Sequence, residues 1–223
     1  MTTVFRLNRR RFLTTSAIVT GAAMLPFSGP LWAAAAARKG GTLRISVDQA
    51  VGVLNPLLTR VNPEYLLSEL LYNGLTRLSQ DMQAEPDLAQ SWSHDESLTE
   101  WTFTLRSNLK FHDGSACTAK DVAASLQAIL DPKTASPALR NIGPIKTVEA
   151  LDDVRVKLTT SAPYADLPVS LAYPAAKIVP AAILQGDMTR LSREAVGTGP
   201  FKLVSFEPER MVVVVRNEHF YDP

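Results

Sequence analysis

The amino-acid sequence predicts a mixed α/β fold, and three observations lead to that class. Apolar and polar residues alternate over residues 100–106, EWTFTLR, as in a half-buried strand. Residues 120–130 place apolar side chains at helical spacing. Residues 148–158 and 201–217 have the strand–turn–strand pattern of hairpins. Strands and helices are therefore mixed without the regular alternation of a parallel βαβ fold.

The first predicted strand is residues 40–47, GGTLRISV, where Leu43, Ile45 and Val47 alternate with polar residues. Two Asn-Pro pairs then mark a loop. The second pair is also predicted to start a helix, in which Asn62 caps the first turn and Pro63 takes the first helical position.

This helix is predicted to bury one stripe of leucines and to end at a glycine. Glu64 suits its positive end. Gly74 is predicted to end it in the left-handed conformation. The stripe consists of Leu66, Leu67, Leu70 and Leu71.

The remaining elements follow from shorter signals. Residues 75–78, LTRL, predict a short strand. The helix over 120–130 is predicted to end at Asp131-Pro132. Prolines divide residues 167–184 into short helices and loops. The last hairpin is predicted to turn at residues 207–210.

Composition and charge indicate an ordinary globular protein. The 223 residues are 46% hydrophobic and 20% charged, with a formal net charge of +1. The basic excess lies in four arginines within residues 1–37, and without them the net charge is −3. A body of that charge has no electrostatic reason to bind nucleic acid.

Residues 1–37 are predicted to be a cleaved export signal. Arg9 and Arg10 precede an apolar run that ends in five alanines, the order of charged, apolar and cleavage regions in a signal peptide. Pro26 and Pro30 interrupt the run before it reaches the length of a membrane anchor. The paired arginines followed by Phe-Leu resemble the twin-arginine export motif. Asn8 and Thr14 depart from that motif and leave the general secretory route open. We therefore expect a soluble, periplasmic protein.

The stretch FHDGSACTAKDV, residues 111–122, has a structural and a catalytic interpretation. Thr118 and Asp121 have the spacing of a capping box at a helix start. Cys117, the chain's one cysteine, then fits a buried apolar position. The alternative is an exported thiol hydrolase in which His112 serves as the base for Cys117. The structural interpretation is favoured, because it accounts for the whole stretch.

No metal or cofactor is expected. The three histidines, His94, His112 and His219, stand in separate segments, and the sequence has no His-x-x-x-His or Cys-x-x-Cys spacing. It also has no glycine-rich phosphate loop.

Several motifs in order resemble the extracytoplasmic solute-binding proteins of ABC transporters that serve peptides and, in some members, nickel (family 5). The resemblance runs from about Gly40 to Pro223, with two departures: Cys117 replaces a larger apolar residue, and Ser97-Leu98 replaces an Asp-Gly turn. The motifs are YNGLTRL, AEPDLAQSW, EWTFTLRSNLKFHDGSACTAKDV, VGTGPFKLVSFEP and VVRNEHFYDP.

The resemblance implies a periplasmic-binding-protein-like type II clamp of which the chain holds the first lobe. Residues 1–37 would be the signal peptide, 38–69 and 195–223 the lobe's core subdomain, and 70–194 a family-specific second subdomain. Family members are more than twice as long, so the second lobe would be absent and the chain a fragment or a truncated product.

The resemblance also implies a ligand-contact loop and a function without catalysis. TRVNPEY corresponds to the loop whose backbone pairs with an extended peptide, so Arg60, Val61 and Asn62 are the expected ligand-binding residues. Tyr72 is expected in the core. The protein would capture peptides or a related small solute and deliver them to an ABC permease in the inner membrane, as a monomer when full length. The alternatives are the thiol hydrolase and a non-transport sensor or chaperone of the same fold.

Overall fold

The computed structural model describes residues 40–222, so the predicted signal peptide over residues 1–37 lies outside the described residues. From Ile45 onward the chain forms one compact unit. Its strands are β1 (Thr76–Leu78), β2 (Ala84–Pro86), β3 (Ala89–His94), β4 (Glu100–Leu105), β5 (Ile145–Ala150), β6 (Arg155–Thr160), β7 (Phe201–Glu207) and β8 (Met211–Arg216). Its α-helices are α1 (Asn62–Leu71), α2 (Ala119–Leu130), α3 (Leu167–Ser170) and α4 (Ala181–Gln185).

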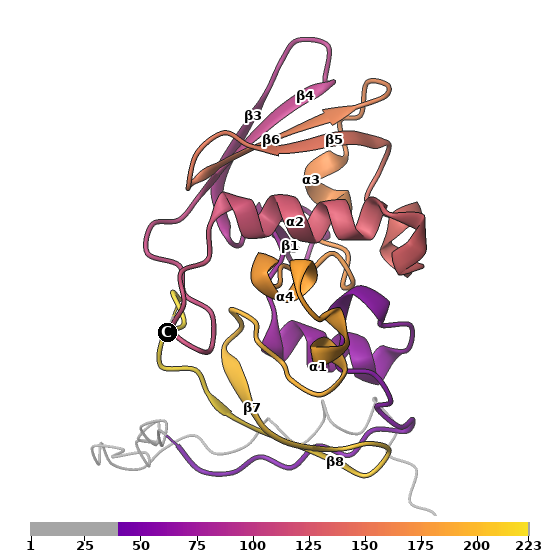
Figure 1. Cartoon of the computed structure of the whole chain (residues 1–223), viewed down its shortest axis with the longest axis vertical. Coiled ribbons are helices and arrows are strands. Elements are labelled where there is room, and N and C mark those ends of the chain that lie inside the picture. Colours follow the sequence, from indigo (N-terminus) through magenta and orange to yellow (C-terminus); the bar gives the residue numbers. More distant parts are fainter. Residues whose placement is uncertain (1–39, 223) are drawn as a thin grey trace, which may run out of the picture. The chain divides into compact units, whose positions relative to one another are not determined.

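The main sheet is antiparallel, with strand order β3-β4-β6-β5 (Figure 1). The alternation seen in the sequence sets its two faces. Trp101, Phe103 and Leu105 are buried on β4, and Val156 and Leu158 lie on the same side of β6. The predicted mixed α/β class is confirmed.

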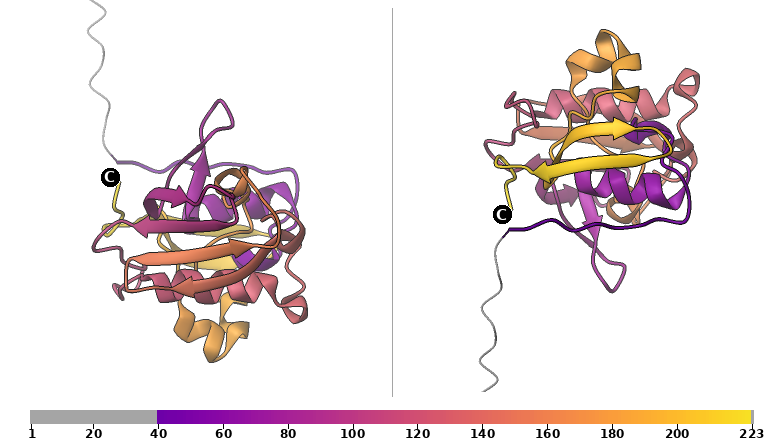
Figure 2. Two further views of the ribbon diagram at one scale, coloured as in Figure 1. Left: turned by 90° about the horizontal axis from the view of Figure 1, so that it is seen from above. Right: turned by 90° about the horizontal axis from the view of Figure 1, so that it is seen from below.

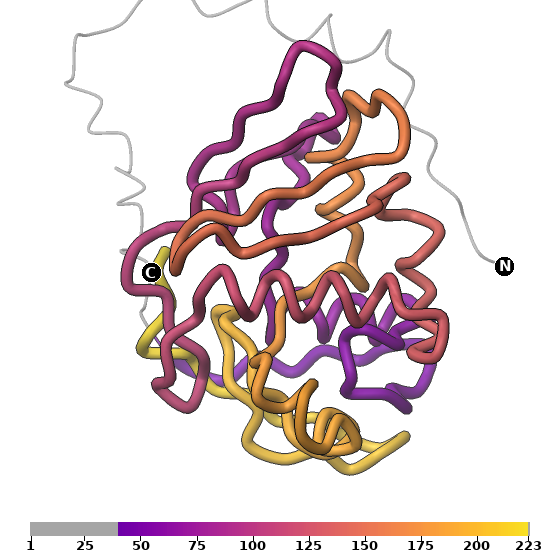
Figure 3. The backbone as a smooth tube through the Cα atoms, turned by 45° about the horizontal axis from the view of Figure 1, so that its top comes forward, coloured from indigo at the N-terminus to yellow at the C-terminus, as the bar shows by residue number. Residues whose placement is uncertain are grey.

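Helix α2 covers the buried face of this sheet (Figures 1 and 3). Its buried side chains are Val122, Leu126 and Ile129, as the periodicity predicts. Thr118 and Asp121 form the predicted capping box, in which the Asp121 carboxylate accepts from the Thr118 N–H at 2.8 Å. The helix ends before Asp131, as predicted.

The hairpin of β7 and β8 forms a separate two-stranded sheet, with α1 packed beside β7 (Figure 2). The loop before β7 crosses the end of α1 with almost no room for a side chain. A Cβ on Gly197 would lie 2.0 Å from the Leu71 carbonyl oxygen, and one on Gly199 would lie 2.5 Å from the Leu71 carbonyl carbon. The two glycines therefore allow the close approach of two backbones.

A buried polar network joins segments that lie far apart in the sequence. The Asp87 carboxylate accepts from the Asn73 side chain at 2.8 Å, from the Gly74 N–H at 3.0 Å and from the Tyr221 hydroxyl. The Arg106 side chain donates to the Asp87 carbonyl at 2.8 Å, and its guanidinium lies 4.8 Å from the Tyr221 ring centre.

The network continues into the loop before β7. The Thr198 hydroxyl donates to the Asn73 side-chain oxygen at 3.0 Å, and the Asn217 side chain donates to the Gly199 carbonyl at 2.8 Å. Residues from the YNGLTRL, AEPDLAQSW, VGTGPF and RNEHFYDP motifs therefore meet at one buried junction.

The predicted strand at residues 40–47 is wrong, because the structure forms no strand there. Leu43, Ile45 and Val47 are 83%, 62% and 47% exposed. A strand is defined by its ladder of hydrogen bonds to a neighbour, and no described residue pairs with this segment.

Helix α1 forms, but several predicted details are wrong. Val61 precedes its first residue, and the Asn62 side chain makes no capping bond. Leu67 and Leu71 are buried, whereas Leu66 is 45% exposed, because only one side of this short helix faces the core. The last residue of the helix is Leu71. The next residue, Tyr72, has an extended backbone, so Gly74 does not terminate the helix.

Candidate functional site

The predicted ligand-contact residues form an exposed, extended turn at the start of α1. Val61 is extended, with φ −121° and ψ 156°, and its carbonyl accepts from the Glu64 and Tyr65 N–H groups at 3.0 and 3.1 Å. The Arg60 N–H donates to the Glu64 carboxylate at 2.9 Å, and its guanidinium donates to the Ala135 carbonyl at 3.4 Å. This chain of bonds fixes the path of the turn.

The N–H groups of Val61 and Asn62 have no hydrogen-bond acceptor among the described residues. Neither donates a hydrogen bond to any group within residues 40–222. Both lie at the positive end of α1, where unbonded N–H groups attract carbonyl or carboxylate oxygens. The turn therefore has two backbone donors without an acceptor among the described residues.

The loop after α3 is fastened along α1 by three side-chain contacts. The Tyr65 and Tyr173 hydroxyls lie 3.2 Å apart, with ring centres 6.1 Å apart in an edge-on arrangement. The Ser68 hydroxyl donates to the Pro174 carbonyl at 3.3 Å. The Lys177 ammonium, almost fully buried, pairs with the Glu69 carboxylate at 2.7 Å. These contacts join the loop to α1 at Tyr65, Ser68 and Glu69.

The contacts of Tyr65, Tyr173 and Lys177 between α1 and the loop after α3 were not predicted from the sequence. Only the sequence position of Tyr65, three residues after Asn62 on a helix, could have suggested that it lies near the turn. Tyr173 and Lys177 lie in a proline-divided segment without a periodic pattern, so nothing local predicts their contacts.

No hydrogen bond joins the His112 ring to Cys117 among the described residues. Cys117 is 6% exposed, and its burial raises the pKa of the thiol, which keeps it protonated and unreactive. The Cys117 position in the core agrees with the structural interpretation of this stretch. Tyr72 is likewise buried, as predicted.

The His112 ring instead binds the backbone of the loop before β7. Its Nδ1 lies 3.3 Å from the Gly197 nitrogen and 3.3 Å from the Ala195 carbonyl oxygen, and its Nε2 lies 3.2 Å from the Gly199 carbonyl oxygen. Burial lowers the pKa of His112, and the contacts with the Ala195 and Gly199 carbonyl oxygens oppose this shift in part. A neutral ring accepts from the Gly197 N–H and donates to Gly199.

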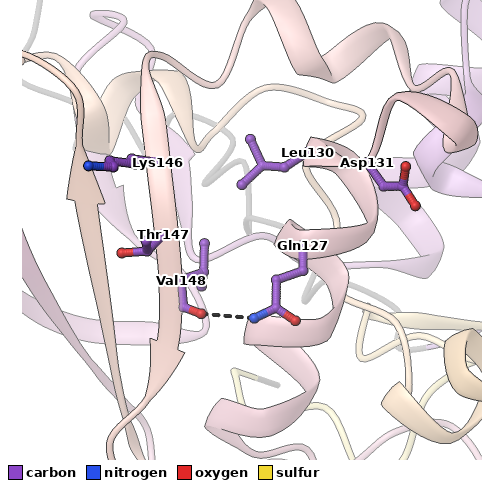
Figure 4. A pocket seen from close by; sticks show the side chains of 6 residues that line it. All are labelled: Gln127, Leu130, Asp131, Lys146, Thr147 and Val148. Carbon is purple, nitrogen blue, oxygen red and sulfur yellow. Dashed lines mark hydrogen bonds between the residues drawn. The ribbon is translucent and has the colours of Figure 1, made fainter.

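A hollow of about 480 Å³ lies between the end of α2 and β5 (Figure 4). The Gln127 side chain crosses it and donates to the Val148 carbonyl at 2.9 Å. Figure 4 shows the Lys146 ammonium directed away from α2. The lining groups do not converge on a common point, so this hollow is a weaker candidate site than the turn. Its lining consists of Gln127, Leu130, Asp131, Lys146, Thr147 and Val148.

Within residues 40–222, no three His, Cys, Asp or Glu side chains are grouped so that they could hold a metal ion. None of the helices described has the length and apolar character that a membrane crossing requires.

Comparisons with known proteins agree on one family. Residues 83–223 match the family model described as bacterial extracellular solute-binding proteins, family 5 Middle. The chain is 33% identical to the probable D,D-dipeptide-binding periplasmic protein of Escherichia coli (strain K12), over 75% of this chain and 34% of that protein. It is 31% identical to the nickel-binding periplasmic protein of the same strain, over 77% and 33%.

A solved structure gives the same result for the fold. The binding protein AgaA from A. tumefaciens R10, in complex with agropinic acid, superposes with a TM-score of 0.72 at 33% identity, over 76% of this chain and 34% of that one. The chain thus spans about a third of the length of the relatives it matches. Because the family model matches more than half of the chain, the chain belongs to the bacterial extracellular solute-binding proteins of family 5.

Proposed function

We propose that the chain belongs to the substrate-binding component of an ABC importer, which captures peptides or a related small solute and delivers it to a permease in the inner membrane. The match of residues 83–223 to family 5 carries this proposal. The named ligands of the relatives, a D,D-dipeptide, nickel and agropinic acid, differ in chemistry. Family membership therefore supports solute binding without selecting the solute.

The proposed contact residues are Arg60, Val61 and Asn62. Their support is the exposed extended backbone, which has two unbonded N–H groups. Backbone pairing suits a carrier of peptides, because it accepts many side chains. In the proposed domain arrangement, 38–69 and 195–223 form the core subdomain and 70–194 the second one, and the turn lies in the core subdomain.

Titration of the purified chain with a pool of di- to pentapeptides tests this function. Pockets bind by surrounding 70–90% of a ligand's surface, as a rough guide, and the turn supplies one wall. We therefore expect dissociation constants no tighter than about millimolar. Amide shifts in NMR spectra should map to residues 60–62. Shifts confined to another surface would contradict the proposed site, and saturable micromolar binding would contradict the one-wall argument.

We propose export to the periplasm through the signal over residues 1–37. The relatives named as periplasmic proteins support this location. Replacing Arg9 and Arg10 with lysine should block export by the twin-arginine route, which recognises arginine and not charge alone. Normal export of the double variant would assign the protein to the general secretory route.

We propose no catalytic activity for the chain. The curated relatives compared above are named as binding proteins. The buried Cys117 thiol and the backbone-bound His112 ring both support this reading over the thiol hydrolase. No specific contact favours the sensor or chaperone alternative.

A further inference from the structure

Asn73 and Gly74 form an Asn-Gly pair that lies within the buried junction. Of the seven asparagines in the sequence, only Asn73 precedes a glycine. An asparagine loses its side-chain amide most readily before glycine, because glycine has no side chain to hinder the approach of its backbone nitrogen. The sequence therefore places the chain's most reactive asparagine at a position that the fold buries.

The reaction requires both residues of the pair to be free of other partners. The Gly74 nitrogen attacks the side-chain carbonyl carbon of Asn73 and closes a succinimide ring. The amide nitrogen of Asn73 leaves as ammonia and takes up the proton of the Gly74 N–H. One water molecule then opens the ring at either carbonyl, which leaves aspartate or isoaspartate at position 73.

In the folded chain, one carboxylate holds both reacting groups. Asp87 Oδ1 accepts from the Asn73 side-chain amide at 2.8 Å, and Asp87 Oδ2 accepts from the Gly74 N–H at 3.0 Å. The Thr198 hydroxyl donates to the Asn73 side-chain oxygen at 3.0 Å. The Asn73 side chain therefore cannot turn toward the Gly74 nitrogen without breaking buried hydrogen bonds, each of which is costly to leave unmade.

Burial protects the pair further. Asn73, Asp87 and Thr198 are 8%, 2% and 1% exposed, so little water reaches the carbonyl that the reaction must hydrolyse. The bond to Asp87 also keeps the proton on the Gly74 nitrogen, and the attack needs that proton to leave.

We propose that Asn73 is a deamidation site that folding protects. The reaction is slow while the junction is closed, and it is fast in chains whose junction is open or unfolded. Water is the one co-reactant, and ammonia is the one product released.

Deamidation should prevent the junction from closing again. The amide of Asn73 donates to Asp87 and accepts from Thr198, whereas an aspartate at this position keeps only the accepting role. Two carboxyl groups would then meet where a bond of 2.8 Å now lies, and carboxylates that share a site disfavour one another's charge. In isoaspartate, the carbonyl of residue 73 that accepts from the Ile178 N–H at 3.0 Å would no longer lie in the main chain.

The test measures deamidation at Asn73 in the full chain, kept native or unfolded in guanidinium chloride at pH 8, by mass spectrometry of tryptic peptides. Trypsin releases residues 61–77, in which the other asparagine, Asn62, precedes Pro63 and cannot react, since proline has no backbone N–H. We expect the unfolded chain to react at least about tenfold faster than the native chain. Equal rates would overturn the proposed protection.

Loosening the amide should speed the reaction in the native chain. Thr198→Val removes the hydroxyl that holds the Asn73 side-chain oxygen, so we expect a several-fold rise in the native rate. Tyr164→Phe, which loses a hydroxyl bond to Ser170 instead, is the matched control and should react as the parent does. An unchanged rate in Thr198→Val would show that the junction bonds do not protect Asn73.

The consequence of the reaction is tested with the product itself. Asn73→Asp should unfold at a lower urea concentration than the parent, whereas Asn141→Asp, the same change at an exposed position, should remain close to it. An unchanged midpoint for Asn73→Asp would show that the junction tolerates aspartate.

If Asn73→Asp does not fold, the parent still gives the answer. Parent chains that have partly reacted in guanidinium chloride are refolded, and the folded and unfolded fractions are separated and digested. The folded fraction should be depleted of chains modified at residue 73. Equal modification in the two fractions would overturn the proposed block to refolding.

Discussion

Tyr221 donates its hydroxyl hydrogen to the carboxylate of Asp87, a residue 134 positions earlier in the chain. Asp87 is 2% exposed and also accepts from Asn73 and Gly74. One buried carboxylate thus fastens the end of the described chain to the segment that follows α1.

Removing this hydroxyl should destabilise the fold. Tyr221→Phe keeps the ring beneath the Arg106 guanidinium and loses a hydrogen bond to a charged group, so we expect the free energy of unfolding in urea to fall by about 1.5–3 kcal/mol. Tyr164→Phe, which removes a neutral bond to the Ser170 hydroxyl, is the control and should cost less. An unchanged Tyr221→Phe midpoint would mean that the buried bond is not formed in solution.

The stability of the fold should depend on the protonation of His112. The Gly197 N–H requires the unprotonated Nδ1, and the pKa of His112 is lowered in the folded state. The neutral ring's contribution to the free energy of unfolding is therefore fully present above the pKa of His112 in the unfolded chain, about 6.5. It is lost as the pH falls through the lower pKa of the folded state. Lys202 and Asp113 are the charged groups that act on the ring, in opposite directions.

Urea unfolding between pH 7.5 and pH 5 measures this dependence. The parent should lose more stability toward pH 5 than His112→Gln, which cannot titrate at this position. Parallel pH profiles for the two proteins would show that the ring does not titrate differently in the folded and unfolded states.

Cys117 should react with thiol reagents only after unfolding. The side chain is buried, and the pKa of the thiol is raised by burial and by the charge of Asp121. Labelling of the native protein at pH 7 should therefore be slow and should accelerate in step with urea unfolding. Rapid labelling of the native protein would instead support the alternative function as a thiol hydrolase.

Gly197→Ala should destabilise the contact between α1 and the loop before β7. The new methyl group would lie 2.0 Å from the Leu71 carbonyl oxygen. A backbone oxygen cannot rotate away as a side chain can, so we expect the free energy of unfolding, measured in urea, to fall by at least about 2 kcal/mol. Gly52→Ala meets no atom closer than 3.8 Å and should be close to neutral. Equal stability of the two variants would show that the loop can move away from α1.

Elements with a strong local pattern could be predicted from the sequence. The strand at 100–106, the capped helix after Thr118 and the hairpin at 201–217 each contain their own period, cap or turn, and each appears at nearly the predicted bounds. The alternation at residues 43–47 is just as clear, but the strand is absent, because alternation cannot supply a partner.

The buried junction and the bonds at the start of α1 could not be predicted in the same way. The motif GTGPF suggests a turn. Its two glycines are required, however, because the backbone of Leu71, about 120 residues earlier in the chain, packs directly against them. Glu64 could be placed at the positive end of a helix from sequence alone. Its carboxylate bond to the Arg60 N–H, and the bond of the Arg60 guanidinium to the Ala135 carbonyl, depend on tertiary packing.

Helix α1 holds the junction at one end and the exposed turn at the other. Its ten residues make a rod of about 15 Å, longer than the distance over which substitutions usually influence one another's energetics. Changes at residues 60–62 should therefore add independently to changes at Asp87 or Gly197. Substitutions in the proposed contact turn can then be combined without loss of stability at the junction.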